Sequence, residues 1–358
     1  MPLDSPTHIS KTILQRQQDI ANRAWQLQTL LFPELAHKYS GAMEEKCLED
    51  IRYHLQYLYE ALQAYDKHLF THYIHWVNDV LSNRNIPTKE LIDSLGCIKN
   101  VLKQFLSDEE ASLASIYLEE AIDILKLQPK QNQPDFIERS AMQHECKHYL
   151  HLLMNQERHA AYSYVHTLLQ KKHSFQDIYL HIFQASQYEI GRQWQENKIS
   201  VAQEHYCTAV TQQIMSSLLP HIFTIPKKSM RMLACCTSGE LHELGLRMVT
   251  DFFELDGWDT CFLGANTPEQ AVTEMLQQQS FDLIAISTTM TFHIDKVRST
   301  IQRIRAYPTT ENTKIIVGGN PFNIASGLWK NVGADAYAGN AQEAVAVANL
   351  ICASSITA

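Results

Sequence analysis

The chain has 358 residues and a mass of 41.1 kDa, which is too long for one ordinary domain and predicts two or three. Hydrophobic residues make up 45% of the sequence and charged residues 19%, so packed cores are expected and disorder is excluded for most of the chain. The formal net charge is −9 and no long basic run occurs, which argues against non-specific nucleic-acid binding.

The sequence shows neither a signal peptide at its start nor a long apolar run. The first residues lack the apolar core of a signal peptide, and nowhere do 18 apolar residues follow one another. We therefore expect a soluble, cytoplasmic protein that does not contact a membrane. The eight cysteines include no C-x-x-C pair, which predicts reduced and mostly buried thiols.

Residues 1–127 show helical patterns throughout. Apolar residues recur at helical spacing from Asp50 to Tyr65 and again from Leu69 to Leu81, and a further helix is expected after Pro87. This pattern predicts an all-α sensor or interaction domain. Residues 128–135 combine two prolines with polar side chains, which predicts a linker.

Residues 136–225 also show apolar stripes at helical spacing. Four such stretches are separated by short breaks, which predicts a four-helix bundle.

Residues 226–358 change in character, because short β-rich runs alternate with helical ones. Five strands, each followed by a helix, predict a doubly wound, flavodoxin-like parallel sheet with helices on both faces. The helix after the fourth strand is expected at Ile324 to Asn331. In such sheets, ligands bind at the carboxyl ends of the strands.

The loops at those ends exclude three common ligands. The first loop lacks the glycine pair of a dinucleotide site, and no P-loop lysine occurs. A phospho-acceptor aspartate would follow strand three, where the chain has Ser287-Thr288-Thr289.

Three short motifs follow the first, third and fourth strands instead: Glu240-x-His242-x-x-Gly245, Ser287-x-Thr289 and Gly318-Gly319. Their order and intervals resemble the base-off, His-on cobalamin-binding signature, which is usually D-x-H-x-x-G, S-x-L and G-G. The resemblance implies that His242 is the lower axial ligand of cobalt. The displaced nucleotide tail would lie in a channel between strands and helices. Glu at 240 and Thr at 289 depart from the usual Asp and Leu.

Each motif residue suits a role in that site. Glu240 can accept a hydrogen bond from the second imidazole nitrogen and fix the tautomer. The hydroxyls of Ser287 and Thr289 can bond polar groups of the tail, while the glycines permit a close approach of the backbone.

The second helical segment contains Trp194 followed, after nine residues, by Glu204-His205. This pattern resembles the cap of CarH-type adenosylcobalamin photoreceptors. The resemblance implies that Trp194 covers the upper face of the corrin and that Glu204 and His205 contact adenosine. In that family a histidine commonly follows the tryptophan, whereas this chain has Gln195, which puts in doubt a second histidine ligand from that position.

The first segment resembles the globin-like N-terminal domain of photocobilins, which binds biliverdin beside cobalamin. Six residues in the matching helices are candidates for a bilin pocket: Tyr53, His54, Tyr57, Tyr73, His75 and Trp76. The alternative is that these residues belong to a plain helical docking domain.

Together these resemblances predict a non-catalytic light sensor that holds adenosylcobalamin, with biliverdin as an optional second chromophore. Photolysis of the cobalt–carbon bond would change the domain arrangement, the oligomeric state or the binding of a downstream signalling protein. A homo-oligomer (dimer or tetramer) is expected, and direct DNA binding is not. The main alternative is a corrinoid methyl carrier of a methyltransferase system. A radical mutase subunit and an adaptor without cofactor are further alternatives.

Overall fold

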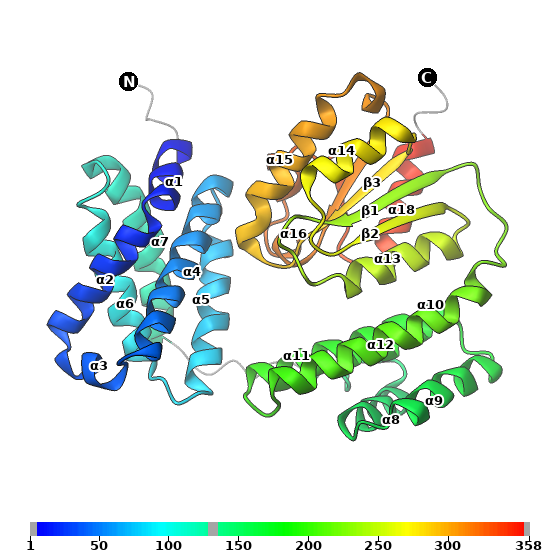
Figure 1. Ribbon diagram of the computed structural model, residues 1–358, viewed down its shortest axis with the longest axis horizontal. Helices are drawn as coiled ribbons and strands as arrows, with labels where there is room; N and C mark the ends of the chain where they lie inside the picture. The colour runs from blue at the N-terminus through cyan, green and yellow to red at the C-terminus, as the bar shows by residue number, and fades with distance from the viewer. Residues whose placement is uncertain (1–5, 128–134, 354–358) are drawn as a thin grey trace. The chain divides into compact units, whose positions relative to one another are not determined.

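The computed structural model describes residues 6–127 and 135–353, with no side-chain description before Lys11, and the chain divides into two compact units (Figure 1). The first unit contains the described residues up to Leu127 together with Met290–Asp295 and Ile324–Asn331, and the second contains the remainder. The predicted linker at 128–135 lies outside the described residues except for Asp135.

The amino-terminal part of the first unit is helical, as predicted. Its seven described helices are α1 (Pro6–Gln15), α2 (Gln17–Leu31), α3 (Pro33–Lys38), α4 (Ala42–Ala64), α5 (Lys67–Ser82), α6 (Thr88–Leu102) and α7 (Asp108–Leu127). The break between α4 and α5 has a local cause. Tyr65 is left-handed (φ 54°), and the Asp66 carboxylate caps α5 by accepting a hydrogen bond from the His68 amide at 2.8 Å.

The second unit begins with four helical stretches, as expected. They are α8 (Gln143–Met154), α9 (Arg158–Gln170), a continuous stretch of α10 (Phe175–Ile178), a π-helical turn (Tyr179–Gln184) and α11 (Ala185–Gln195), and α12 (Val201–Ile222). Ser200 and Gln203 form a capping box that starts α12. That these helices act as a cap over a cofactor stays a prediction.

The second unit also contains a five-stranded parallel sheet. Its strands are β1 (Arg231–Cys236), β2 (Asp259–Gly264), β3 (Leu283–Ser287), β4 (Lys314–Gly318) and β5 (Ala336–Tyr337). Their order is β2-β1-β3-β4-β5, and every pair is parallel. This is the flavodoxin-like order, so the sequence-based prediction of a doubly wound parallel sheet is confirmed.

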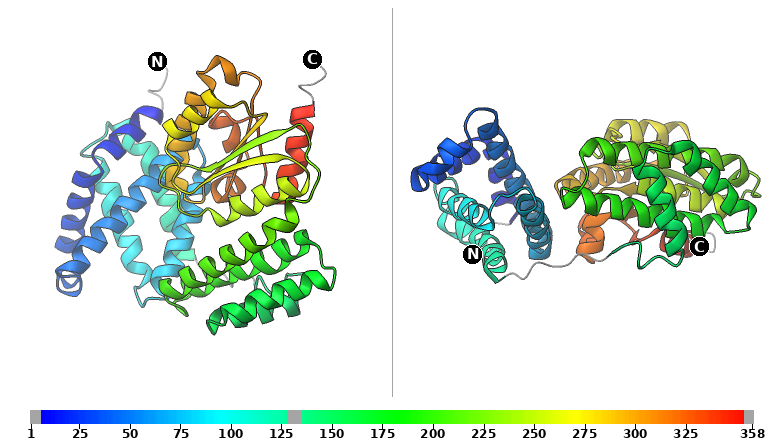
Figure 2. Two further views of the ribbon diagram at one scale, coloured as in Figure 1. Left: turned by 45° about the vertical axis from the view of Figure 1, so that its right-hand side comes forward. Right: turned by 90° about the horizontal axis from the view of Figure 1, so that it is seen from below.

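Each strand is followed by one or two helices. They are α13 (Leu244–Leu255), α14 (Glu269–Gln278), α15 (Ile294–Arg305), α16 (Asn320–Ile324), α17 (Leu328–Asn331) and α18 (Ala341–Ala353), of which α17 belongs to the first unit. Apolar side chains of α13 and α18 form one core with β1 and β3, while α14 and α15 lie on the opposite face (Figures 1 and 2). The single helix predicted at Ile324 to Asn331 is wrong. Two short helices replace it, because Ser326-Gly327 interrupts the pattern.

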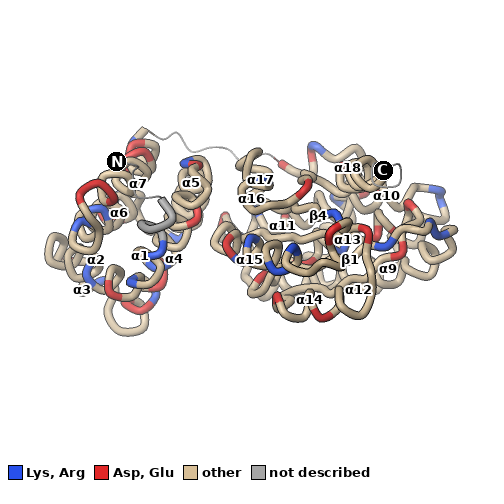
Figure 3. The backbone as a smooth tube through the Cα atoms, turned by 90° about the horizontal axis from the view of Figure 1, so that it is seen from above, with Lys and Arg blue, Asp and Glu red and all other residues tan. Residues whose placement is uncertain are grey.

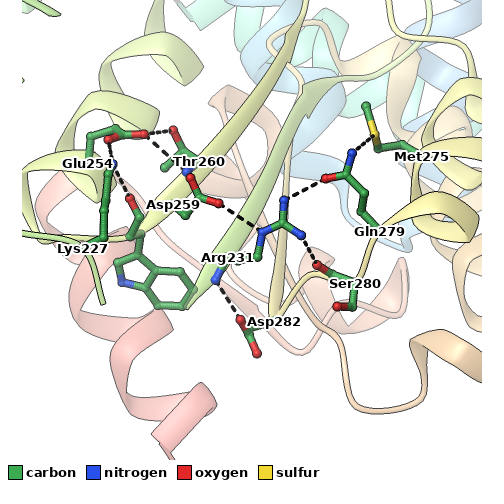
Figure 4. Close-up of polar contacts among 10 residues, drawn as sticks. Lys227, Arg231, Glu254, Asp259, Thr260, Met275, Gln279, Ser280 and Asp282 are labelled. Carbon is green, nitrogen blue, oxygen red and sulfur yellow. Dashed lines mark hydrogen bonds and ion pairs between the residues drawn. The ribbon is translucent and has the colours of Figure 1, made fainter. Parts of the chain in front are cut away.

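A polar network fixes the end of the sheet where the strands begin (Figure 4). The Arg231 guanidinium pairs with Asp259 at 3.1 Å, and the Arg231 amide donates to Asp282 at 2.7 Å. Thr260 donates to the Glu254 carboxylate at 2.6 Å. These contacts tie the starts of β1 and β2 to the segment before β3. The carboxyl ends of the strands lie on the opposite side of the sheet.

The distribution of charged residues and the state of the cysteines agree with the expectations from the sequence. Basic and acidic residues are interspersed along the described chain (Figure 3). None of the described helices combines the length and the apolar character that a membrane crossing requires. All eight cysteines are unpaired, and six of them are buried.

Candidate functional site

The loop between β1 and α13 carries the first motif, and a buried carboxylate organises it. Glu240 has no exposed surface. Its backbone is fixed on both sides, since its amide donates to the Thr237 carbonyl at 3.0 Å and its carbonyl accepts from the Asn266 amide at 2.8 Å. The side chain therefore points from a defined turn into the protein.

His242 lies above this carboxylate with 60% of its side chain exposed. Its Nδ1 is 2.5 Å from Glu240 Oε1, and its backbone amide donates to the same oxygen at 3.0 Å. Because a carboxylate only accepts, Nδ1 carries the proton and Nε2 keeps its lone pair. Among the residues that the structure describes, Nε2 makes no hydrogen bond. An exposed nitrogen lone pair on a fixed ring is suited to metal ligation.

The carboxylate of Glu240 makes the His242 imidazole more basic. The hydrogen bond with Glu240 raises the pKa of His242, burial opposes this rise, and the charges of Glu240 and Glu204 add to it. The same carboxylate makes the neutral imidazole a stronger electron donor.

The second oxygen of Glu240 reaches the end of β3. Oε2 accepts hydrogen bonds from the Thr288 hydroxyl at 3.1 Å and from the Thr289 amide at 2.8 Å. The sequence pattern pointed to Ser287 and Thr289 and missed Thr288. Nothing in the run Ser-Thr-Thr shows which hydroxyl turns towards the first loop.

The glycines of the third motif lie where β4 ends. Gly319 has φ 104°, and a Cβ at this position would lie 1.9 Å from the Thr288 carbonyl oxygen. The backbones of the second and third motifs thus approach each other closely. At Gly245, in the first turn of α13, a Cβ would meet no atom within 4 Å, so the fold itself does not require glycine there.

The cap motif lies on two helices of the same unit. Trp194 is near the end of α11 and packs, partly buried, against the helical core. Glu204, near the start of α12, contacts His205 at 2.6 Å and accepts from Thr208 at 3.0 Å. Gln212, on the same helix as Glu204, donates a hydrogen bond to Glu243 at 3.0 Å, so α12 lies against the first loop. Gln195 is buried.

The six bilin candidates are divided between the core and the surface of the first unit. Tyr57 and Tyr73 are buried and stacked, with ring centroids 3.5 Å apart. His54 Nδ1 is 2.7 Å from the Tyr73 hydroxyl, and burial lowers the pKa of His54 to about 4. Tyr53 is exposed, while His75 and Trp76 are half-buried. Contact of any of these residues with a bilin stays a prediction.

Two parts of the chain match families described as B12 binding domain. The matches cover residues 230–348 and residues 146–219. The chain is a cobalamin-binding protein. A third match, to the family described as phycobilisome protein, covers residues 5–125.

Curated relatives of this cobalamin-binding protein match about a third of it. Dimethylamine corrinoid protein 1 of Methanosarcina acetivorans is 31% identical over 116 residues, which are 32% of this chain and 53% of the relative. The dimethylamine corrinoid protein of Methanosarcina barkeri gives the same identity and coverage. The chain thus spans about half the length of these relatives.

A solved structure supports the fold of the cobalamin-binding protein. The monomethylamine corrinoid protein of Methanosarcina barkeri has a TM-score of 0.53 and 21% identity, and the match covers 59% of this chain and all of that one. The two curated relatives and this solved protein are all corrinoid proteins named after methylamines.

Proposed function

We propose that this protein holds cobalamin in the base-off form with His242 as the lower axial ligand of cobalt. The observation that carries this proposal is the exposed imidazole of His242, whose Nδ1 is bonded to the fully buried Glu240. The residues fit the group, because Nε2 is available and the open space at Gly245 leaves room for a close approach. Cobalamin would supply a cobalt centre with an exchangeable upper ligand.

The protein residues would bind and orient this group. Glu240 keeps the imidazole in one tautomer and one orientation. Ser287, Thr289, Gly318 and Gly319 would line the entrance to the tail channel. Trp194, Glu204 and His205 would face the upper side of the corrin.

The first candidate for the use of this site is a corrinoid methyl carrier. It rests on the curated relatives, which are corrinoid proteins named after dimethylamine. In this role the chain would carry a methyl group rather than catalyse its transfer, and its partner would be a methyltransferase.

One specific observation favours a second candidate, the adenosylcobalamin light sensor. Residues 5–125 match the family described as phycobilisome protein, whereas the sequence matches to the dimethylamine corrinoid proteins cover only about a third of the chain. In this role the adenosyl group would lie beneath Trp194, and biliverdin would bind in the first unit. Homo-oligomer formation and a downstream signalling partner belong to this candidate.

One experiment tests the binding proposal and separates the candidates. The full chain is mixed with hydroxocobalamin, methylcobalamin and adenosylcobalamin, and absorption spectra are recorded in the dark and after green light. Base-off, His-on spectra that are lost in His242→Ala support the proposed ligand. A change of oligomeric state after illumination supports the sensor, while methyl transfer to a thiol acceptor with a methyltransferase supports the carrier. Absence of binding in all three cases overturns the proposal.

A further inference from the structure

Glu243, which follows His242 directly, joins three parts of the second unit. Its Oε1 accepts a hydrogen bond from Gln212 Nε2 on α12 at 3.0 Å. Its Oε2 accepts from the Ala265 amide, just after β2, at 2.7 Å. One carboxylate therefore connects the loop of His242 both to the sheet and to a helix of the cap segment.

The end of β2 is shaped to receive this carboxylate. Gly264 has φ 80°, and a Cβ at this position would lie 2.8 Å from Glu243 Oε2. Any larger residue would therefore displace the carboxylate and would itself be strained. The backbone at Gly264 and Ala265 therefore forms a binding site for the Glu243 carboxylate.

Among the described hydrogen bonds, the one between Gln212 and Glu243 alone joins α12 to the His242 loop. Elsewhere α12 and α13 share an apolar core that includes Ile214, Met215 and Phe252. Packed helices can slide by small amounts along an apolar interface, whereas a hydrogen bond to a fixed carboxylate selects one position. The same helix carries Glu204 and His205, so its position also sets where the cap motif lies.

Glu240 and Glu243 hold the loop from two sides. Glu240 ties it to the end of β3, and Glu243 ties it to the end of β2 and to α12. We propose that Glu243 is a positioning residue that sets α12, and with it the cap motif, at a fixed distance from His242. This inference rests on the proposed cobalamin site and extends it.

The test uses the full chain and hydroxocobalamin as the probe. Glu243→Ala should weaken binding about tenfold, in the range typical for residues that support a metal ligand, and should lower the His-on fraction in the absorption spectrum. Glu243→Gln should restore most of the affinity, because an amide can accept from Ala265 and donate to Gln212. Gly264→Ala should reproduce the loss.

A double-mutant cycle of Gln212 and Glu243 tests whether the two side chains act through the same contact. Gln212→Ala should weaken binding in the wild-type background and have no further effect in Glu243→Ala. The neighbouring Gln213, which is exposed on the same helix, provides the matched control, and Gln213→Ala should bind normally. If Glu243→Ala does not fold, Gln212→Ala and Gly264→Ala still carry the test.

The outcomes separate this inference from the binding proposal. Wild-type affinity in Glu243→Ala, or independent effects of the two alanine substitutions, overturns the positioning role while His242→Ala still loses the ligand. If the wild type does not bind hydroxocobalamin, or if His242→Ala binds it unchanged, the site itself is wrong and the inference fails with it.

Discussion

His242 Nδ1 lies 2.5 Å from Oε1 of Glu240, so an exposed imidazole is bonded to a carboxylate with no exposed surface. The carboxylate is held in turn by donors from the end of β3. The ring orientation of His242 is therefore determined by buried groups rather than by solvent, which is how preorganised metal ligands are held.

We expect His242→Ala to remove the His-on spectrum and to weaken cobalamin binding at least tenfold, because the substitution deletes the proposed axial ligand. Folding should be preserved, since the ring is largely exposed. Absorption titration with hydroxocobalamin measures both effects. The control is His144→Ala, which changes an exposed histidine on α8. Equal losses in the two variants would contradict the assignment.

Glu240→Asp should weaken the site, although aspartate is the usual residue of the signature. The shorter side chain cannot reach His242 and the donors of Thr288 and Thr289 together. At least one buried donor then loses its partner, which costs about 1–3 kcal/mol of unfolding free energy. Urea denaturation measures this loss. Unchanged stability together with an unchanged His-on spectrum would show that the longer side chain is not needed.

The sequence predicted much of the fold for a physical reason. The apolar runs of β1, β3 and β4 are buried on both faces, so they differ clearly from the amphipathic helices between them. The contact of Glu240 with His242 was also predictable, because a tight loop leaves few relative positions for two side chains that are two residues apart. Their role on cobalt remains a proposal.

Features that depend on tertiary packing were not predictable. Glu243 showed no signal, since its partners Gln212 and Ala265 are brought to it only by the folded chain. The π-helical turn at Tyr179–Gln184 also gives no local pattern. Its buried Tyr179 donates to Asp251 of α13 at 2.7 Å, a contact between segments distant in sequence.

Two glycines of the cobalamin motifs should behave in opposite ways when changed to alanine. Gly319→Ala should lower the unfolding free energy by at least about 3 kcal/mol, because its φ is positive and its Cβ would overlap the Thr288 carbonyl. Gly245→Ala should be neutral or stabilising by up to about 1 kcal/mol, because alanine favours a helix and meets no atom.

Gly245→Ala should affect cobalamin binding even though it does not lower stability. If the open space there is used by the corrinoid, Gly245→Ala should reduce the affinity for hydroxocobalamin while thermal or urea unfolding stays normal. A stable Gly245→Ala variant with full affinity would show that the corrinoid does not approach this residue.

Asp251 should make stability depend on pH. Burial raises its pKa to about 6, against the opposing influence of Arg247 and the Tyr179 hydrogen bond. Between about pH 4 and 6 the folded state keeps a proton that the unfolded state has released. The unfolding free energy therefore falls as pH rises through this range, by up to about 3 kcal/mol for a shift of about two units, and stays constant above it.

Asp251→Asn removes this contribution while its side-chain oxygen can still accept from Tyr179. Relative to the wild type, the variant should gain stability as pH rises from 4 to 6, because it has no carboxylate to ionise in the buried site. Urea unfolding at several pH values measures the difference, and Asp123→Asn, at an exposed position, is the control substitution. A difference between Asp251→Asn and the wild type that does not change with pH would mean that Asp251 is already ionised at pH 4, with Arg247 outweighing the effect of burial.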